Sequence, residues 1–177
     1  MAASNLARTR IALISTGGTI EKTYDEISGL LENHVSVLDV MLNSLELGGV
    51  EIFRTRLMNK DSSEMKDSDH ELIAATALQM SRAYDGVVIV HGTDRLAVTG
   101  GRIPDDVKSP VVLTGAMRPY LLRNTDAVQN LTEALLAVQL LPPGVFVAMH
   151  NKVLSFPGVE KDITNGTFVR SSDSPPK

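Results

Sequence analysis

Hydroxyl, carboxylate and ammonium groups gather in five short polar segments of this sequence, at residues 16–20, 59–65, 91–94, 115–119 and 161–165. A threonine hydroxyl becomes a nucleophile only when a neighbouring base removes its proton. Paired glycines, as in the first segment, allow backbone N–H groups to point at an oxyanion. The residue types are therefore those of nucleophilic catalysis, although a plain strand-to-helix turn also explains the first segment taken alone.

Thr93 and Asp94 stand side by side directly after an apolar run. Asp94 is adjacent to a hydroxyl that needs a base, but an aspartate at this point is equally suited to cap a helix. Lys161 is the better base if the fold brings it close to Thr93. A lysine in a polar loop is usually solvated, so the residues alone leave both alternatives open.

Composition excludes several classes of site. The chain has no cysteine, and His34, His70, His91 and His150 lack the spacing of metal ligands, so we expect no metal and no cofactor. We expect His91 to make structural hydrogen bonds. The net charge of −4 and the scattered lysines and arginines argue against a nucleic-acid partner. No stretch approaches the roughly 20 apolar residues that cross a bilayer, and residues 1–10 do not resemble a secretory signal, so we expect a soluble cytoplasmic protein without a membrane partner.

Strand and helix patterns alternate along the chain, which predicts a mainly parallel sheet with helices on both faces. In such sheets ligands bind beyond the carboxyl ends of the strands, where the five polar segments fall. We expect one α/β domain over residues 1–170 and a mobile polar tail at 171–177. Strands are predicted at 11–16, 51–58, 87–90, 111–114 and 145–149, and helices at 35–47, 68–84 and 125–140. The packed faces of the last two helices are predicted to be Leu72, Ala75, Leu78 and Met80, and Val128, Leu131, Leu135 and Val138.

Two of these segments, Thr-Gly-Gly-Thr-Ile at 16–20 and His-Gly-Thr-Asp at 91–94, resemble the paired signatures of the bacterial-type L-asparaginases. The segments at 113–119 and 62–65 fit the same family, and the resemblance runs from Ile11 to about Phe168. It implies a three-layer, flavodoxin-like α/β fold, the asparaginase N-terminal domain. The chain ends where family members normally enter a second, smaller domain. It is therefore most similar to the short, single-domain bacterial L-asparaginases, which lack that domain.

The resemblance also implies roles for particular residues. Thr19 would attack the side-chain amide of L-asparagine and form an acyl-enzyme, assisted by the Tyr24 phenol. Thr93, Asp94 and Lys161 would orient water or relay a proton. The substrate-binding groups implied are Asp94 for the α-ammonium, Ser62 for the α-carboxylate, the Ala116 carbonyl for the amide nitrogen, and Gly18, Ser63 and Gly92 around them.

Some positions depart from the family pattern. Arg95 stands where a small hydroxyl residue is usual, Ser63 replaces a frequent glutamine, and residues 95–103 resemble a shortened helix. Two alternatives to an L-asparaginase therefore stay open: a glutaminase or amidotransferase-type domain, and a catalytically dead domain that binds an amino acid. We also expect a homo-oligomer, a dimer or tetramer, because Leu- and Met-rich helix faces suit subunit contacts, although the same residues suit a core.

Overall fold

A computed structural model of the chain describes residues 8–25, 29, 31–32 and 37–173. Within them, six strands form one sheet in the order β4-β1-β5-β6-β7-β8, in which only β8 runs antiparallel. The parallel strands are β1 (Thr9–Gly17), β4 (Val50–Lys60), β5 (Gly86–Val90), β6 (Pro110–Thr114) and β7 (Gly144–Met149), and β8 is Lys152–Ser155. The predicted α/β fold, a mainly parallel sheet between helices, is confirmed.

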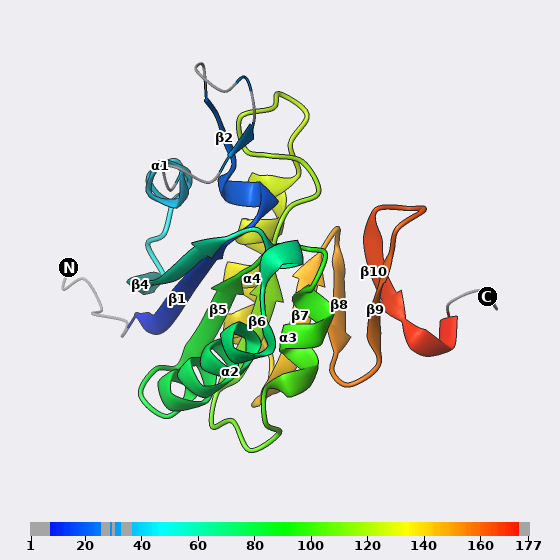
Figure 1. Cartoon of the computed structure of the whole chain (residues 1–177). Coiled ribbons are helices and arrows are strands. Elements are labelled where there is room, and N and C mark those ends of the chain that lie inside the picture. The colour runs from blue at the N-terminus through cyan, green and yellow to red at the C-terminus, as the bar shows by residue number, and fades with distance from the viewer. Residues whose placement is uncertain (1–7, 26–28, 30, 33–36, 174–177) are drawn as a thin grey trace, which may run out of the picture.

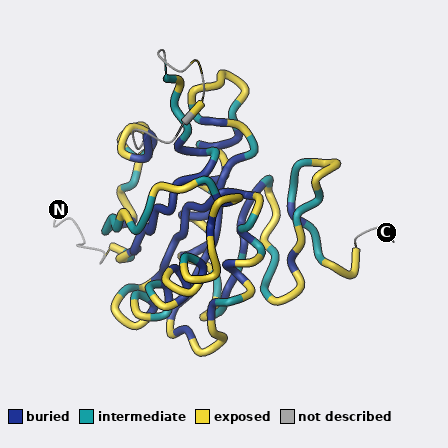
Figure 2. Tube along the Cα trace, viewed as in Figure 1, coloured by how far each residue is buried: buried dark blue, intermediate teal, exposed yellow. Residues whose placement is uncertain are grey.

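Helices cover both faces of the sheet (Figure 1). One face packs against α1 (Leu38–Asn43) and α4 (Ala127–Leu140), and the other against α2 (Asp67–Ser81) and α3 (Leu96–Arg102). Alternate residues of β1 serve the two cores: Ile11 and Leu13 face α1 and α4, whereas Ala12 and Ile14 face α2 and α3. Figure 2 shows the central strands as the most continuously buried part of the chain. Strands buried on both faces explain the near-continuous apolar runs of the sequence.

Two of the predicted helices need correction. The helix predicted at 35–47 is shorter: α1 ends at Asn43, well before the two glycines expected to stop it, and residues 35 and 36 lie outside the described part. In α2, Leu78 and Met80 pack against the core as predicted, but Leu72 is 49% exposed and Ala75 is exposed as well. The buried apolar residues of α2 are Ile73, Ala74 and Ala77. The apolar residues of α2 surround the helix, so the face that docks is chosen by the fit against the sheet rather than by the sequence pattern.

The sequence patterns did not identify the last strands. Beyond β8, β9 (Val159–Asp162) and β10 (Thr167–Arg170) form an antiparallel hairpin beside the sheet (Figure 1). Val159 and Phe168 anchor it in the core on the α3 side. A small ribbon of β2 (Thr23–Tyr24) and β3 (Leu31–Glu32) follows the first loop.

Three single 3₁₀ turns complete the description: η1 (Thr19–Glu21), η2 (Ser62–Glu64) and η3 (Ser171–Asp173). The predicted mobile tail includes η3, and its residues 174–177 lie outside the described part. Among the described residues, no helix is both long enough and apolar enough to span a membrane.

Candidate active site

Backbone contacts bring the loops after β1, β4, β5 and β6 together at the carboxyl edge of the sheet. A methyl group on Gly18 would lie 2.4 Å from the Gly92 Cα, and one on Gly92 would lie 2.5 Å from the Ser62 Oγ. A methyl group on Gly115 would similarly meet the His91 carbonyl oxygen at 2.3 Å. These separations are too short for any side chain at the glycines. The loops can therefore interlock only because these positions lack a Cβ.

Lys161 joins Thr93 and Asp94, from which it is 68 and 67 residues distant in sequence. Its Nζ donates hydrogen bonds to the Thr93 Oγ1 at 2.9 Å and to the Asp94 Oδ1 at 2.6 Å. Thr93 is buried, the Lys161 side chain is only 20% exposed, and Asp94 lies open to solvent. Because Lys161 donates to the Thr93 oxygen, the Thr93 hydroxyl proton remains available for another acceptor. The structure thus contains the contact between Lys161 and Thr93, which the sequence left conditional on the fold.

Thr19 is the first residue of η1 and is partly buried. Gly18 precedes it with φ 87°, a conformation that glycine adopts without strain. The Gly18 N–H donates to the Lys60 carbonyl at 3.0 Å, and the Thr16 hydroxyl donates to the Val90 carbonyl at 3.0 Å. The Thr19 loop is therefore tied to both neighbouring strands.

Tyr24 lies on the β2–β3 ribbon, and its side chain is 59% exposed. Its ribbon has only two residue pairs, Thr23 with Glu32 and Tyr24 with Leu31. Tyr24 follows Thr19 by five residues, and it belongs to neither core formed by the described residues. The phenol is consequently the least fixed of the predicted site residues.

Ser62 and Ser63 differ although they are adjacent. Ser62 is buried, and its Oγ has no hydrogen-bond partner within the described part of the chain. Ser63 is exposed and donates its hydroxyl to the Asp61 Oδ1 at 2.8 Å. A buried hydroxyl without a partner is costly unless a ligand uses it. Ser62 is accordingly the better placed of the two predicted substrate contacts.

The Ala116 loop is held by three residues that the sequence analysis did not single out for this role: Asp126, Asn130 and His150. The Asp126 carboxylate accepts the N–H groups of Met117 and Arg118, and contacts the His150 Nε2 at 2.7 Å. Asn130 donates to the Gly115 carbonyl at 2.9 Å and accepts the His150 N–H. The sequence did contain one signal for this network: Asn130 is a polar residue within the buried stripe of α4.

Asp126 is charged as well as buried. Burial alone raises the pKa of its carboxyl, but the hydrogen bonds from the Met117 N–H, from His150 and from the Arg118 N–H outweigh burial and hold the pKa below its usual value. His150 also lies 3.3 Å from the Thr167 hydroxyl of β10. The same network thus reaches from the Ala116 loop to the hairpin that carries Lys161.

A chain of buried hydrogen bonds lies under the Thr93 loop. The His91 Nδ1 donates to the Gly92 carbonyl at 2.8 Å, and the His91 Nε2 meets the Thr99 hydroxyl at 2.8 Å. Thr99 in turn contacts the His70 Nδ1 at 2.6 Å. Burial lowers the pKa of His91 to about 4, so its ring is neutral near pH 7. His91 is the structural residue that the sequence predicted, and it fixes the peptide before Thr93.

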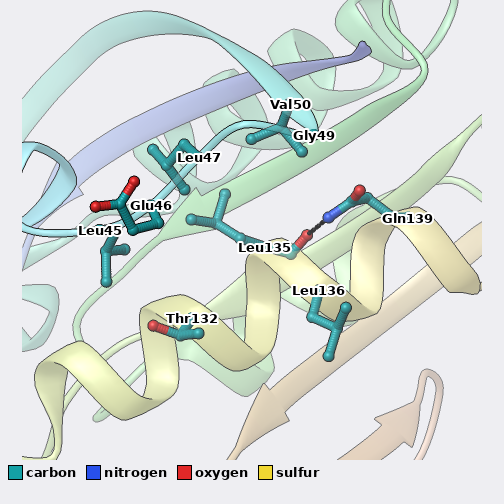
Figure 3. Close-up of a pocket in the computed structure, with 9 residues that line it drawn as sticks. All are labelled: Leu45, Glu46, Leu47, Gly49, Val50, Thr132, Leu135, Leu136 and Gln139. Atoms are coloured by element: carbon teal, nitrogen blue, oxygen red, sulfur yellow. Dashed lines mark hydrogen bonds between the residues drawn. The ribbon is translucent and has the colours of Figure 1, made fainter. Parts of the chain in front are cut away.

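A groove of the described structure lies away from these loops. It measures about 280 Å³ and separates the segment before β4 from α4 (Figure 3). Its lining includes Val50, the first residue of β4, so it lies at the opposite end of that strand from the site. The polar groups of Thr132 and Gln139 bond to carbonyls of their own helix. Polar groups of the described residues do not converge there, so this groove is not the reaction centre. Among the described residues, no three His, Asp or Glu side chains are grouped so as to hold a metal ion.

Known proteins resemble the chain in both sequence and fold. The L-asparaginase of Thermococcus kodakarensis is 30% identical over 148 residues, which cover 82% of this chain and 45% of that protein. A subunit of the glutamyl-tRNA(Gln) amidotransferase of Haloquadratum walsbyi is 34% identical over 144 residues, covering 79% of this chain and 33% of that protein. The chain therefore spans less than half the length of these relatives.

Solved structures show the same relationship. The thermostable L-asparaginase from Thermococcus kodakarensis superposes with a TM-score of 0.79 at 31% identity, over 91% of this chain and 51% of that one. A probable cytoplasmic L-asparaginase from Campylobacter jejuni gives a TM-score of 0.73 at 32% identity, over 87% of this chain and 50% of that one. The sequence profile of a family described as "Asparaginase, N-terminal" matches residues 10–175. The chain therefore belongs to the asparaginase family, and its sheet and helices form that family's N-terminal fold.

Proposed function

We propose that this protein hydrolyses the side-chain amide of L-asparagine to L-aspartate and ammonia. Membership of the asparaginase family supports an amidohydrolase. The observation that carries the proposal is the contact of Lys161 with both Thr93 and Asp94, beside the Thr19 loop. The Thr93 hydroxyl is hydrogen-bonded to the Lys161 side chain, which is itself paired with the Asp94 carboxylate. Such an arrangement is suited to proton transfer.

In the first half-reaction, the Thr19 oxygen attacks the amide carbon and loses its proton. The carbon–nitrogen bond breaks, and the leaving nitrogen takes a proton and departs as ammonia, which leaves an ester on Thr19. The Tyr24 phenol, on the neighbouring ribbon, assists proton removal. Backbone N–H groups of the glycine loops are the groups suited to hold the developing oxyanion.

In the second half-reaction, water attacks the ester carbon and releases L-aspartate with the regenerated Thr19 hydroxyl. Thr93 orients the water, and its hydroxyl proton is free because Lys161 already donates to its oxygen. Asp94 keeps the Lys161 amine in place. The proton that water loses passes through these side chains to the Thr19 oxygen, so the step as written balances with water and the side chains named.

Substrate binding needs fixed partners for both α-groups. Ser62, buried and without a partner in the described structure, suits the α-carboxylate. Asp94 is 58% exposed, so its carboxylate can accept the α-ammonium in addition to Lys161. The Ala116 carbonyl suits the amide nitrogen, and Gly18, Ser63 and Gly92 complete the pocket. A carboxylate for the α-ammonium and a buried hydroxyl for the α-carboxylate favour a small zwitterion over a larger apolar ligand.

Ammonia release from L-asparagine by the purified protein tests the proposal. We expect turnover that EDTA does not change and that Thr19→Ala lowers by at least about 10³-fold, since removing a nucleophile removes the covalent step. Thr132→Ala, on the outer face of α4, is the matched control and should retain activity. Near-normal turnover in Thr19→Ala would contradict the acyl-enzyme step.

A second function has a specific observation in its favour. Several relatives are subunits of glutamyl-tRNA(Gln) amidotransferases, at up to 34% identity. An amidotransferase-type domain would release ammonia efficiently only from glutamine or only with a partner protein present. Assays of ammonia release from asparagine and from glutamine by the protein alone therefore distinguish the two functions. A dead amino-acid-binding domain would bind L-aspartate in calorimetry without any turnover.

The remaining expectations concern the whole protein. We include a cytoplasmic location in the proposal, supported by the description of the Campylobacter relative as a probable cytoplasmic enzyme. A homo-oligomer is also part of it, because Leu136, Leu140 and Val153 are exposed apolar residues on α4 and β8. Light scattering coupled to gel filtration measures the assembly directly.

A further inference from the structure

The turns that carry Thr19 and Ser62 have the same form. Each is a single 3₁₀ turn, and each begins with the hydroxyl residue assigned to the substrate. Lys22 closes the first turn, since its N–H donates to the Thr19 carbonyl at 3.2 Å. Asp61 opens the second, since its Oδ1 accepts the Ser63 N–H at 3.0 Å. Lys22 and Asp61 are thus each bound to the turn beside them.

An ion pair joins these two residues directly. The Lys22 Nζ donates to the Asp61 Oδ2 at 2.6 Å, and the two side chains are only 25% and 29% exposed. The carboxylate therefore uses one oxygen for its own turn and the other for the Thr19 turn. The hydrogen bond from Lys22, followed by that from the Ser63 N–H, lowers the pKa of Asp61 to about 2, so its carboxylate stays charged throughout the neutral range.

A second attachment lies on the other side of Thr19. The Gly18 N–H donates to the Lys60 carbonyl, and Gly92 fills the space between Gly18 and Ser62. The Thr19 turn is therefore fixed to the Ser62 segment at both of its ends, at Gly18 through the backbone and at Lys22 through charge. Ile20, between these two ends, is buried in the core, so the ion pair acts on a turn that is already packed and fixes the position of its Lys22 end relative to Ser62.

We propose that the Lys22–Asp61 ion pair sets the separation between Thr19 and Ser62, and thereby the length of the amide side chain that the site accepts. This inference rests on the proposed function, in which Ser62 holds the α-carboxylate and Thr19 meets the amide carbon. Glutamine is longer than asparagine by one carbon–carbon bond, about 1.5 Å. A pocket of fixed length discriminates by about 10- to 200-fold for one methylene group.

Lys22→Met tests the ion pair, because it keeps the length of the side chain and removes its charge. We expect kcat/KM for L-asparagine to fall about tenfold and that for L-glutamine to fall much less, so that their ratio narrows at least about fivefold. Asp61→Asn should have the same effect while keeping an oxygen for the Ser63 N–H. Lys22→Arg should restore the ratio, because a guanidinium can still bind the carboxylate.

Lys60→Met is the matched control. The Lys60 Nζ lies 2.7 Å from the Asp69 Oδ1, in an ion pair of the same kind that joins β4 to the start of α2 and not to the Thr19 turn. Its removal should leave the ratio unchanged. Equal losses for both amides in Lys22→Met, or an equal change of ratio in Lys60→Met, would show that the Lys22 pair is merely structural.

A binding measurement distinguishes a failure of the ion-pair proposal from a failure of the proposed function. Calorimetry with L-aspartate and L-glutamate, the products of the two reactions, measures length selection without turnover. A wild-type protein that hydrolyses neither amide but prefers the shorter product, with the preference narrowed in Lys22→Met, would retain the ion-pair proposal and reject the hydrolase. Absence of any preference in the wild-type protein would overturn the ion-pair proposal even if ammonia is released.

Discussion

Thr93 and Thr19 both follow buried strands, yet the structure fixes their surroundings by different means. The Thr93 half has the His91 chain beneath it and the β9–β10 hairpin beside it, anchored by Val159 and Phe168. The Thr19 half has a single turn and a two-pair ribbon that leaves Tyr24 exposed. Core packing thus holds the proton-transfer groups through the hairpin, and it also holds the Thr19 turn through Ile20, which is buried in the core on the α1 and α4 side. The exposed part of the Thr19 half is the ribbon that carries Tyr24. Changes in the buried network around Thr93 should therefore alter both chemistry and stability, and changes on the exposed ribbon chemistry alone.

The largest effect should come from the residue that links the hairpin to Thr93. Lys161→Met keeps the stem and removes the ammonium, so we expect kcat to fall about 10²- to 10³-fold. Circular dichroism should show an unchanged fold. Lys152→Met provides the control, because Lys152 donates to the Phe168 carbonyl of the same hairpin and its removal should leave kcat unchanged. Full activity in Lys161→Met would mean that the contact is a surface ion pair.

The stability of the Thr93 half depends on Asp126, whose hydrogen-bond network reaches the hairpin that carries Lys161. Asp126→Asn replaces the carboxylate with an amide, so that an NH2 group faces some of the donors that the carboxylate accepts. We expect the free energy of unfolding to fall by about 2–4 kcal/mol. Urea denaturation measures the loss. Glu133→Gln, at a carboxylate that accepts the Asn151 N–H at the surface, should cost less than about 1 kcal/mol. Equal losses in the two variants would remove the distinction between the buried network and the surface.

Acid should weaken the same half through His91. The folded protein keeps His91 neutral down to about pH 4, whereas the unfolded chain binds that proton near its ordinary pKa of 6.5. Stability is therefore fully present above pH 6.5 and is lost as the pH falls toward 4, by up to about 3 kcal/mol. Burial also lowers the pKa of His70, which adds a loss of the same sign.

His91→Asn isolates the contribution of His91, because its amide can still donate to the Gly92 carbonyl. The free energy of unfolding should then fall less steeply between pH 6.5 and 4 than in the parent protein. An identical slope in the two proteins would assign the acid sensitivity to other groups.

The smallest effect should come from the exposed ribbon. Tyr24→Phe removes the hydroxyl of an exposed side chain, so the midpoint of thermal unfolding should not change measurably. If the phenol assists Thr19, kcat should fall about tenfold. Unchanged kcat would remove Tyr24 from the mechanism and leave the comparison of stabilities intact.

The central sheet could be predicted from the sequence because its strands are buried on both faces and form apolar runs. The patterns missed β8, β9 and β10, whose four-residue strands mix polar and apolar side chains and owe their pairing to tertiary contacts. Lys161 is identified as a site residue through the family resemblance. Its contact with Thr93 spans 68 residues and depends on that unpredicted hairpin, so local patterns had no means of specifying it.

The missed network of Asp126, Asn130 and His150 has a similar origin. Asp126 directly precedes α4 at the N-cap position and Asn130 lies one turn later, so each is locally typical of a helix cap or a helix surface. Their role emerges only when β7 delivers His150 to the same point. The error in the packed face of α2 arose in the same way, since apolar residues adjacent in the sequence compete for one docking surface.

The interlocked glycines have a consequence for how this fold can change over generations. Gly18 and Gly115 are required by the closeness of neighbouring backbones, whatever reaction the site performs. A descendant that abandoned catalysis would still need them, because an alanine would push the loops apart. Lys161 is held by side-chain hydrogen bonds rather than by close backbones, so it would be free to drift. Among diverged copies of this domain, a surviving lysine at position 161 would therefore be better evidence of an active enzyme than the glycine motifs.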